Sequence, residues 1–371
     1  MTYRILSLDG GGSRALIPVS ILQRLLDKQP NFLNHVNLIA GTSTSGITAL
    51  ILASADTPEQ GLEIARDLWI QGKKLFAESS KVPATADFEF NAKNAIDSIK
   101  SIKSIESIKS ITSARELWNM GKKALTMNKL RGMTALTGAC AYFSQDDLEA
   151  TLHEIFEDKT IADLKHKILI PAINLGTEED EHWAPSIIHN LDNRFNSLSL
   201  VEVALRVAAM PILFPSHSEH IDAALLTNNP ALTAVAQILE DNAATMDEMR
   251  ILSIGTGENP ITLHGSDPDL GYAGWMMDPK LPLAMMQAII ETNSQLTDYQ
   301  CKQIFTGLRY HRLNPKLGRP WLMHEHKAQF IIEAADIAED TPLDSTADWL
   351  NQGGWNDAQP ATHAKRRRSG S

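Results

Sequence analysis

Two glycine-containing turns near the start of the chain carry the residues best suited to chemistry. Ser43 lies in the run G-T-S-T-S-G over 41–46, between a short apolar segment and a buried helical pattern. A serine on such a strand-to-helix turn projects its hydroxyl at the carboxyl end of the strand, as in a nucleophile elbow of G-x-S-x-G type. Gly41 fits this pattern, whereas Ser45 replaces the second glycine and Gly46 follows it. The spacing indicates nucleophilic chemistry at Ser43, and a Ser/Thr-rich helix cap is the alternative.

The other turn consists of three successive glycines, Gly10, Gly11 and Gly12. Consecutive glycine N–H groups at a helix start form a concave set of donors that suits an oxyanion or a phosphate. The turn also fits a dinucleotide fingerprint, but that fingerprint needs an acidic residue at the end of the second strand. The segment 31–40 contains no acidic residue, so nucleotide binding is the weaker interpretation.

The elements that must position these turns alternate between strand and helix. Segments 4–8 and 36–40 are apolar and β-prone, and each leads through a glycine turn into apolar residues at helical spacing. This alternation predicts an α/β fold with a mostly parallel sheet and helices packed on it. The pattern further predicts helices over 145–156, 200–209 and 325–337, and strands over 168–175 and 251–254.

Composition fits one large globular domain with additions. Of 371 residues, 43% are apolar and 21% are charged, which excludes disordered and collagen-like classes. The net charge of −11 argues against a nucleic-acid partner. Cys140 and Cys301 are too far apart to suggest a disulfide framework or a zinc site, so we expect a reducing, cytoplasmic setting. The sequence shows no signal peptide and no apolar run of about 18–20 residues that could span a bilayer.

The segment 72–142 differs from the rest of the chain. It holds 12 Lys or Arg against 6 Asp or Glu, and isoleucine recurs at every third residue from 96 to 111. On a helix this spacing distributes the isoleucines around the whole circumference instead of forming one apolar stripe. Two interpretations remain open: a low-complexity expansion, or a lid or interfacial segment that meets anionic lipid.

Five stretches resemble the patatin-like phospholipases and occur in the family's order between residues 5 and about 315. The glycine turn resembles the D-G-G-G-x-R oxyanion motif, and 41–44 resembles the G-T-S-T-G-G elbow. The segment 221–225, followed by Asn228-Asn229-Pro230, resembles the D-G-G/A aspartate strand. The stretches 206–215 and 252–257 complete the series.

This resemblance implies a three-layer α/β/α fold and a Ser-Asp dyad, with Ser43 as the nucleophile and Asp222 as the group that takes its proton. It further implies oxyanion binding by the amides of Gly10, Gly11 and Gly12, supported by Arg14, Gly41 and Gly46. Arg14 either fixes the glycine loop or meets a lipid phosphate. We expect Asp9 to close the glycine turn through its side chain, and 228–230 to be a turn that fixes the Asp222 strand.

Three positions depart from the family pattern. Ala15, Ser45 and Ala223 stand where the family has glycine. These small-for-small changes affect the expected rate more than the fold, because a displaced nucleophile can cost orders of magnitude. A catalytically weak lipid-binding or regulatory protein of patatin fold is therefore the alternative function.

A histidine-containing triad is the competing mechanism, since α/β-hydrolases keep the chain order Ser, Asp, His. His264, His311, His324 and His326 all lie after Asp222. None of them lies in a recognisable motif or at metal-ligand spacing, so we expect packing or surface roles and no metal site.

The sequence thus predicts a lipid acyl hydrolase of phospholipase A or lysophospholipase type that works through an acyl-enzyme and needs no cofactor. The expected hydrolase domain covers 1–320, interrupted by the insertion 72–142, and a C-terminal helix with a polar, basic tail covers 321–371. The expected partner is a membrane phospholipid or lysophospholipid, met by a cytoplasmic enzyme that binds the membrane peripherally when active. A small-molecule activator is left open, because no residue indicates its site.

Overall fold

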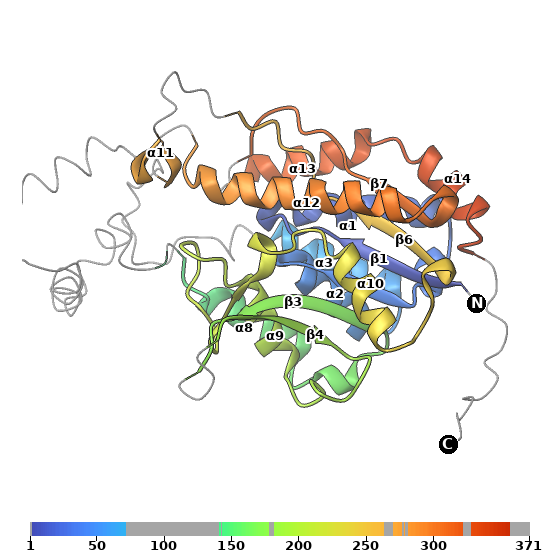
Figure 1. The fold of residues 1–371 in the computed structure, drawn as a ribbon, viewed down its shortest axis with the longest axis horizontal. Helices are drawn as coiled ribbons and strands as arrows, with labels where there is room; N and C mark the ends of the chain where they lie inside the picture. Colours follow the sequence, from blue (N-terminus) through green and yellow to red (C-terminus); the bar gives the residue numbers. More distant parts are fainter. Residues whose placement is uncertain are drawn as a thin grey trace, which may run out of the picture.

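A seven-stranded, mostly parallel sheet forms the centre of the protein in a computed structural model (Figure 1). The structure describes residues 2–71, 141, 143–177, 182–262, 270–276, 278, 281–321 and 328–356. The strand order is β4-β3-β2-β1-β6-β7, with β5 paired to β3. The strands are β1 (Tyr3–Leu8), β2 (Leu38–Gly41), β3 (Lys167–Asn174), β4 (Ala184–His189), β5 (His220–Asp222), β6 (Met249–Ile254) and β7 (Tyr310–Leu313).

The central strands form a parallel set that is covered on both faces. β1 pairs in parallel with β2 and β6, while β4 and β5 run antiparallel to β3. Side chains of β1 alternate between two cores, with Leu6 and Leu8 in one and Ile5 in the other. Strands buried on both faces need near-continuous apolar sequence, which fits the apolar residues of β2 and the three aliphatic residues of β1, between which only the small Ser7 intervenes.

Helices on the two faces complete a three-layer α/β/α sandwich. The core of Leu6 and Leu8 receives side chains from α1 (Leu16–Lys28), α2 (Thr44–Ser54), α3 (Pro58–Ile70), α8 (Asp146–Phe156), α9 (Leu200–Ala208), α13 (Ala328–Asp340) and α14 (Asp344–Gln352). The core of Ile5 receives side chains from α10 (Ala231–Glu240) and α12 (Ala284–Ile304). The short helix α11 (Tyr272–Met276) precedes α12. The predicted three-layer fold is confirmed.

Most elements predicted from local pattern are present within two or three residues of their expected bounds. The helix expected over 325–337 is α13, and those expected over 145–156 and 200–209 are α8 and α9. No local pattern predicts β4, β7 or helix α12, and the strand at Asp222, now β5, was expected from the family resemblance alone. The predicted insertion 72–142, apart from Ala141, lies outside the described residues, as does the basic tail. In the part of the chain that the structure describes, no helix is long and apolar enough to cross a membrane.

The C-terminal helices α13 and α14 pack into the main core. Trp355 is fully buried, and its indole N–H donates to the Phe32 carbonyl at 3.0 Å. Beside it, the Arg4 guanidinium donates to the Gly354 carbonyl at 3.0 Å. The described residues 328–356 therefore share one core with β1 and the helices packed on it.

Replacing Trp355 tests this integration. Trp355→Ala is expected to lower the free energy of unfolding by about 3–5 kcal/mol, because it removes a large buried side chain. Trp183→Ala is the matched control, since Trp183 is 79% exposed and should change stability little. Urea denaturation followed by circular dichroism measures both, and equal effects would contradict the assignment of Trp355 to the core.

Candidate active site

Ser43 lies on a strained turn between β2 and α2. Its backbone has φ 56° and ψ −132°, a conformation that side-chain-bearing residues rarely adopt and that local packing must enforce. A Cβ on Gly41 would come within 2.2 Å of the Ser45 carbonyl oxygen, and one on Gly46 would come within 2.9 Å of Ile170. Glycine is therefore required where strand and helix approach each other.

The substitution at Ser45 leaves this turn intact. Ser45 is fully buried, and its N–H donates to the Thr42 carbonyl at 3.0 Å as the first turn of α2 begins. The close approach to Gly41 involves the Ser45 backbone and not its side chain. The Ser45 hydroxymethyl group therefore does not crowd Gly41, and its buried Oγ has no hydrogen-bond partner among the described residues.

The register of β3 brings Asp222 to the nucleophile. β2 pairs with β3 as far as Leu169, and β5 pairs with the same strand from Ala172, opposite Asp222. Asp222 therefore lies just beyond the end of β2, where the chain has turned away at the elbow. The Ser43 hydroxyl donates to Asp222 Oδ2 at 2.5 Å, and the Ala224 N–H donates to Oδ1 at 2.8 Å.

Burial changes the acidity of Asp222. The side chain is fully buried, and loss of water raises its pKa to about 7, although the hydrogen bonds from Ser43 and Ala224 act in the opposite direction. A carboxylate with this pKa, held by one hydroxyl, can accept a proton from that hydroxyl as the oxygen attacks an electrophile. The pair has the geometry of an activated serine.

The glycine turn offers two free amides beside Ser43 and not the three expected. The Gly10 N–H donates to the Asn228 carbonyl at 3.0 Å, so the expectation that this amide binds an oxyanion is wrong. Within the described residues, the amides of Gly11 and Gly12 donate to no protein acceptor, and both residues line the pocket in front of Ser43. Gly12 has φ 57°, which favours glycine at this position.

Asp9 anchors this loop to the sheet instead of closing the turn by itself. Its carboxylate receives two hydrogen bonds from Arg312 on β7, at 2.7 and 2.5 Å, and one from Ser294 on α12 at 2.6 Å. The carboxylate raises the pKa of the buried Arg312 guanidinium, and Arg312 also donates to Ser253 on β6 at 2.7 Å. The strand that leads into the glycines is thereby tied to its neighbours.

Arg14 fixes the other side of the loop. Its guanidinium pairs with Glu291 of α12 at 2.9 Å, and it donates to the Gly257 carbonyl at 3.4 Å. Of its two expected roles, these contacts favour holding the loop, because the charge is already matched by a partly buried carboxylate.

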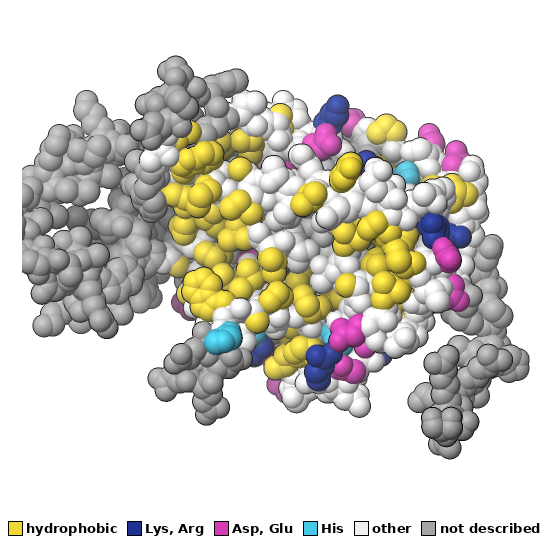
Figure 2. All heavy atoms as spheres, viewed as in Figure 1, with side chains coloured by type: hydrophobic (Ala, Val, Ile, Leu, Met, Phe, Trp, Pro, Cys, Tyr) yellow, Lys and Arg dark blue, Asp and Glu magenta, His cyan; other side chains and the backbone are white. Residues whose placement is uncertain are grey.

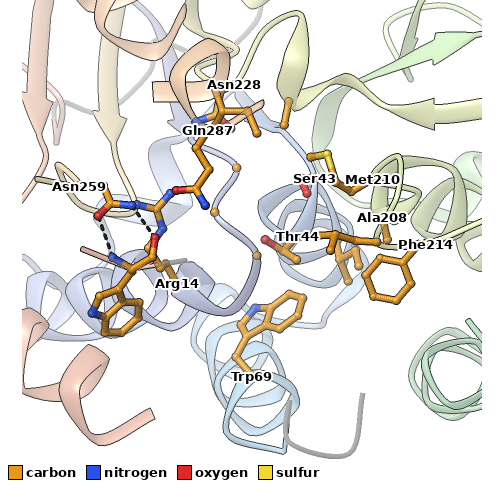
Figure 3. Close-up of a pocket in the computed structure, with 18 of the residues that line it drawn as sticks. Arg14, Ser43, Thr44, Trp69, Ala208, Met210, Phe214, Asn228, Asn259 and Gln287 are labelled. Atoms are coloured by element: carbon orange, nitrogen blue, oxygen red, sulfur yellow. Dashed lines mark hydrogen bonds between the residues drawn. The ribbon is translucent and has the colours of Figure 1, made fainter. Parts of the chain in front are cut away.

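The pocket that contains Ser43 encloses about 890 Å³, part of it open to solvent. Apolar side chains line one part of it, including Ile47, Trp69, Leu148, Met210, Phe214 and Ile290. Polar side chains line another part, and Figure 3 shows Arg14, Asn259 and Gln287 gathered on the side of the glycine loop away from Ser43, Met210 and Phe214. The pocket can thus hold an apolar chain and a polar group at once.

The structure supplies no histidine for a triad among the described residues. His311 stacks on Trp349 with 5.3 Å between ring centroids and bonds to Thr346 at 2.9 Å. His264, His324 and His326 lie outside the described residues. The described residues also contain no cluster of three or more His, Cys, Asp or Glu that could hold a metal ion.

Sequence reasoning missed the contributions of α12 to the site. Asn293 accepts from the Asn228 N–H at 2.8 Å and donates to the Ala224 carbonyl at 2.9 Å, which holds the loop after Asp222. Gln287 and Glu291 line the pocket from the same helix. The available signal was the three- and four-residue spacing of polar side chains in the first half of this segment, which places them on one side of a helix.

A sequence model described as patatin-like phospholipase matches residues 6–235, which include both Ser43 and Asp222. The chain belongs to the patatin-like phospholipase family.

Relatives and solved structures span most of the chain. Protein teg of Priestia megaterium is 24% identical over 335 residues, covering 85% of this chain and 88% of that protein. A cGAMP-activated phospholipase of Pseudomonas aeruginosa is 26% identical over 327 residues, covering 85% and 79%. VipD from Legionella pneumophila aligns with a TM-score of 0.40 and 14% identity over 95% of this chain and 67% of that chain.

The raised pKa of Asp222 predicts a pH-dependent effect of Asp222→Asn on stability. In the unfolded chain the carboxyl ionises near pH 4, and in the folded protein near pH 7. Wild-type stability should therefore fall as the pH rises between these values, by an amount on the order of 1–4 kcal/mol, and the variant should escape this loss. Thermal unfolding at pH 4 to 8 measures the difference, and a stability difference independent of pH would contradict the assignment.

Proposed function

We propose that this protein is a lipid acyl hydrolase of phospholipase A or lysophospholipase type, with Ser43 and Asp222 as its catalytic dyad. The observation that carries the proposal is the 2.5 Å hydrogen bond between the Ser43 hydroxyl and the buried Asp222 carboxylate. Membership of the patatin-like phospholipase family and the partly apolar pocket support a lipid ester as the substrate.

The reaction follows from the geometry of the elbow. Ser43 Oγ attacks the ester carbonyl carbon while its proton passes to Asp222 Oδ2, and the carbonyl oxygen becomes an oxyanion. The amides of Gly11 and Gly12 hold this oxyanion, a contribution worth about 10²–10³ in rate for each donor. The alcohol leaves with the proton from Asp222, and the fatty acyl group remains on Ser43. Water, deprotonated by Asp222, then attacks the acyl-enzyme, and Asp222 returns this proton to Ser43 Oγ as the fatty acid leaves.

Contact with a membrane surface fits the exposed side chains around the pocket. Figure 2 shows hydrophobic side chains spread over the face that carries α12, with charged groups mainly toward its margins. Ile212, Met285 and Ile289 are each at least 40% exposed and stand next to residues that line the pocket. A peripheral enzyme would meet its lipid on this face.

Loss of either dyad residue is expected to remove activity. Ser43→Ala and Asp222→Asn should each lower fatty-acid release from mixed phospholipid and lysophospholipid vesicles by at least about 10³-fold, because no other base bonds the serine among the described residues. Ser54→Ala is the matched control, as Ser54 ends α2 away from the pocket and bonds only the Ile51 carbonyl.

Labelling by a serine-reactive phosphonate separates this proposal from a catalytically weak lipid-binding protein. Wild type and Ser54→Ala should be labelled, whereas Ser43→Ala should not. Unlabelled wild type that still binds lipid would favour the alternative. The relative in Pseudomonas aeruginosa is named as cGAMP-activated. If the wild type shows neither labelling nor hydrolysis, both assays are therefore repeated with cGAMP before the lipid-binding alternative is accepted.

The pH dependence of activity should report the pKa of Asp222. The carboxyl must be ionised to accept the serine proton, so kcat/KM should rise with pH through about 7 and level off above it. Initial rates on a monomeric lysophospholipid from pH 5 to 9 measure this profile. An acid limb centred near pH 4 would contradict the role of a desolvated carboxylate, and circular dichroism at each pH controls for unfolding.

A further inference from the structure

Two buried carbonyl oxygens in the pocket lack hydrogen-bond partners among the described residues. They are Oδ1 of Asn228 and Oε1 of Gln287, which belong to side chains on residues only 4% and 3% exposed. Buried acceptors are normally satisfied, and one that is not carries a desolvation cost of about 1–3 kcal/mol. Because both residues line the pocket that contains Ser43, the missing partners point to a ligand.

Asn228 stands beside the nucleophile. A Cβ on Gly10 would lie 2.6 Å from Asn228 Oδ1 and 3.1 Å from Ser43 Cβ, so only one glycine separates the carbonyl oxygen from the serine. The Asn228 backbone is fixed at both ends, since its N–H donates to Asn293 and its carbonyl accepts from Gly10. These two bonds anchor the residue beside Ser43, where the atoms next to the scissile ester of a bound substrate would lie.

Gln287 occupies the polar part of the pocket, near Arg14 and Asn259 in Figure 3. Its Nε2 donates to the Pro282 carbonyl at 3.3 Å. Since a carbonyl can only accept, this contact fixes the orientation of the amide and leaves Oε1 as the unpartnered end. A ligand group that satisfies Gln287 must donate a hydrogen bond.

The charge balance of the pocket also disfavours a phosphate at these two positions. Arg14 and Glu291 are the charged residues among the described lining, and they pair with each other at 2.9 Å. Phosphate oxygens are acceptors and would face two further acceptors there, with no unmatched cation among the described lining residues to offset the repulsion. Hydroxyl groups satisfy both carbonyl oxygens without a charge.

We propose that Asn228 and Gln287 form an acceptor subsite that selects monoacyl glycerolipids by their hydroxyl groups. Asn228 accepts from the free hydroxyl on the carbon next to the scissile ester, and Gln287 accepts from a hydroxyl of the headgroup. A diacyl lipid has an ester in place of the first hydroxyl and cannot donate there. This inference rests on the proposed function and specifies its substrate class.

Three matched substrates test the two contacts separately. They are 1-acyl lysophosphatidylglycerol, its 2-deoxy analogue without the hydroxyl beside the ester, and lysophosphatidylpropanol without the headgroup hydroxyls. All three keep the same phosphate and acyl chain, and short chains keep them monomeric. Wild type should favour the first over each analogue by at least about tenfold in kcat/KM, because each analogue leaves one buried acceptor unpartnered.

Two variants should then lose one preference each. Asn228→Ala should no longer discriminate against the 2-deoxy analogue, and Gln287→Leu should no longer discriminate against lysophosphatidylpropanol. Gln237→Leu is the matched control, because Gln237 is also a buried glutamine on a helix but bonds Glu240 and Asp241 outside the pocket. A wild type that treats all three substrates alike, or variants that keep both preferences, would overturn the subsite.

Binding to Ser43→Ala separates this inference from the proposed function. Isothermal titration calorimetry of the three lipids should show the same order of affinity without turnover. Selective binding with no hydrolysis by wild type would support the subsite and contradict the hydrolase. Hydrolysis of all three lipids at equal kcat/KM, together with equal affinities, would support the hydrolase and contradict the subsite.

Discussion

The hydrogen bond between Ser43 and Asp222 joins segments 179 residues apart, and much of the fold serves to make it. Two unfavourable features accompany it: a strained backbone at Ser43 and a carboxylate without water. Neither would persist in an isolated loop. They persist here because β2 and β5 share one neighbouring strand, β3, whose pairing register leaves no freedom in where the elbow and the carboxylate meet.

The ion pair between Asp9 and Arg312 plays the corresponding part for the glycine loop. Removing two charges from water is costly, and the cost is offset only where geometry and further hydrogen bonds are good. Here the pair is bidentate, and Ser253 and Ser294 satisfy the remaining polar atoms. The result is a fixed end to β1, from which Gly11 and Gly12 reach the lining of the pocket.

The sequence alone predicted those elements that depend on interactions between residues close together in the chain. The strands at 4–8 and 36–40 and the turns after them were evident, because glycines, apolar runs and helical spacing act over a few residues. Local pattern does not indicate β5, because it spans only three residues and depends on pairing with β3, so the Asp222 strand was expected from the family resemblance alone. The engagement of the Gly10 amide was equally invisible, since its acceptor at Asn228 is distant in sequence. Ser43 and Asp222 were found through motifs, while Gln287 and Asn293 required the packed helix.

Residues 287–294 of helix α12 contact Asp9 and Arg14 and also line the pocket. Ser294 bonds Asp9, Glu291 pairs with Arg14, and Gln287 faces the pocket, so these contacts recur at helical intervals along one side. Each residue of an α-helix turns the chain by about 100°. One inserted or deleted residue within this stretch would rotate part of that side away from its partners. The length of the stretch from Gln287 to Ser294 is therefore constrained as strictly as the identity of the residues that make these contacts.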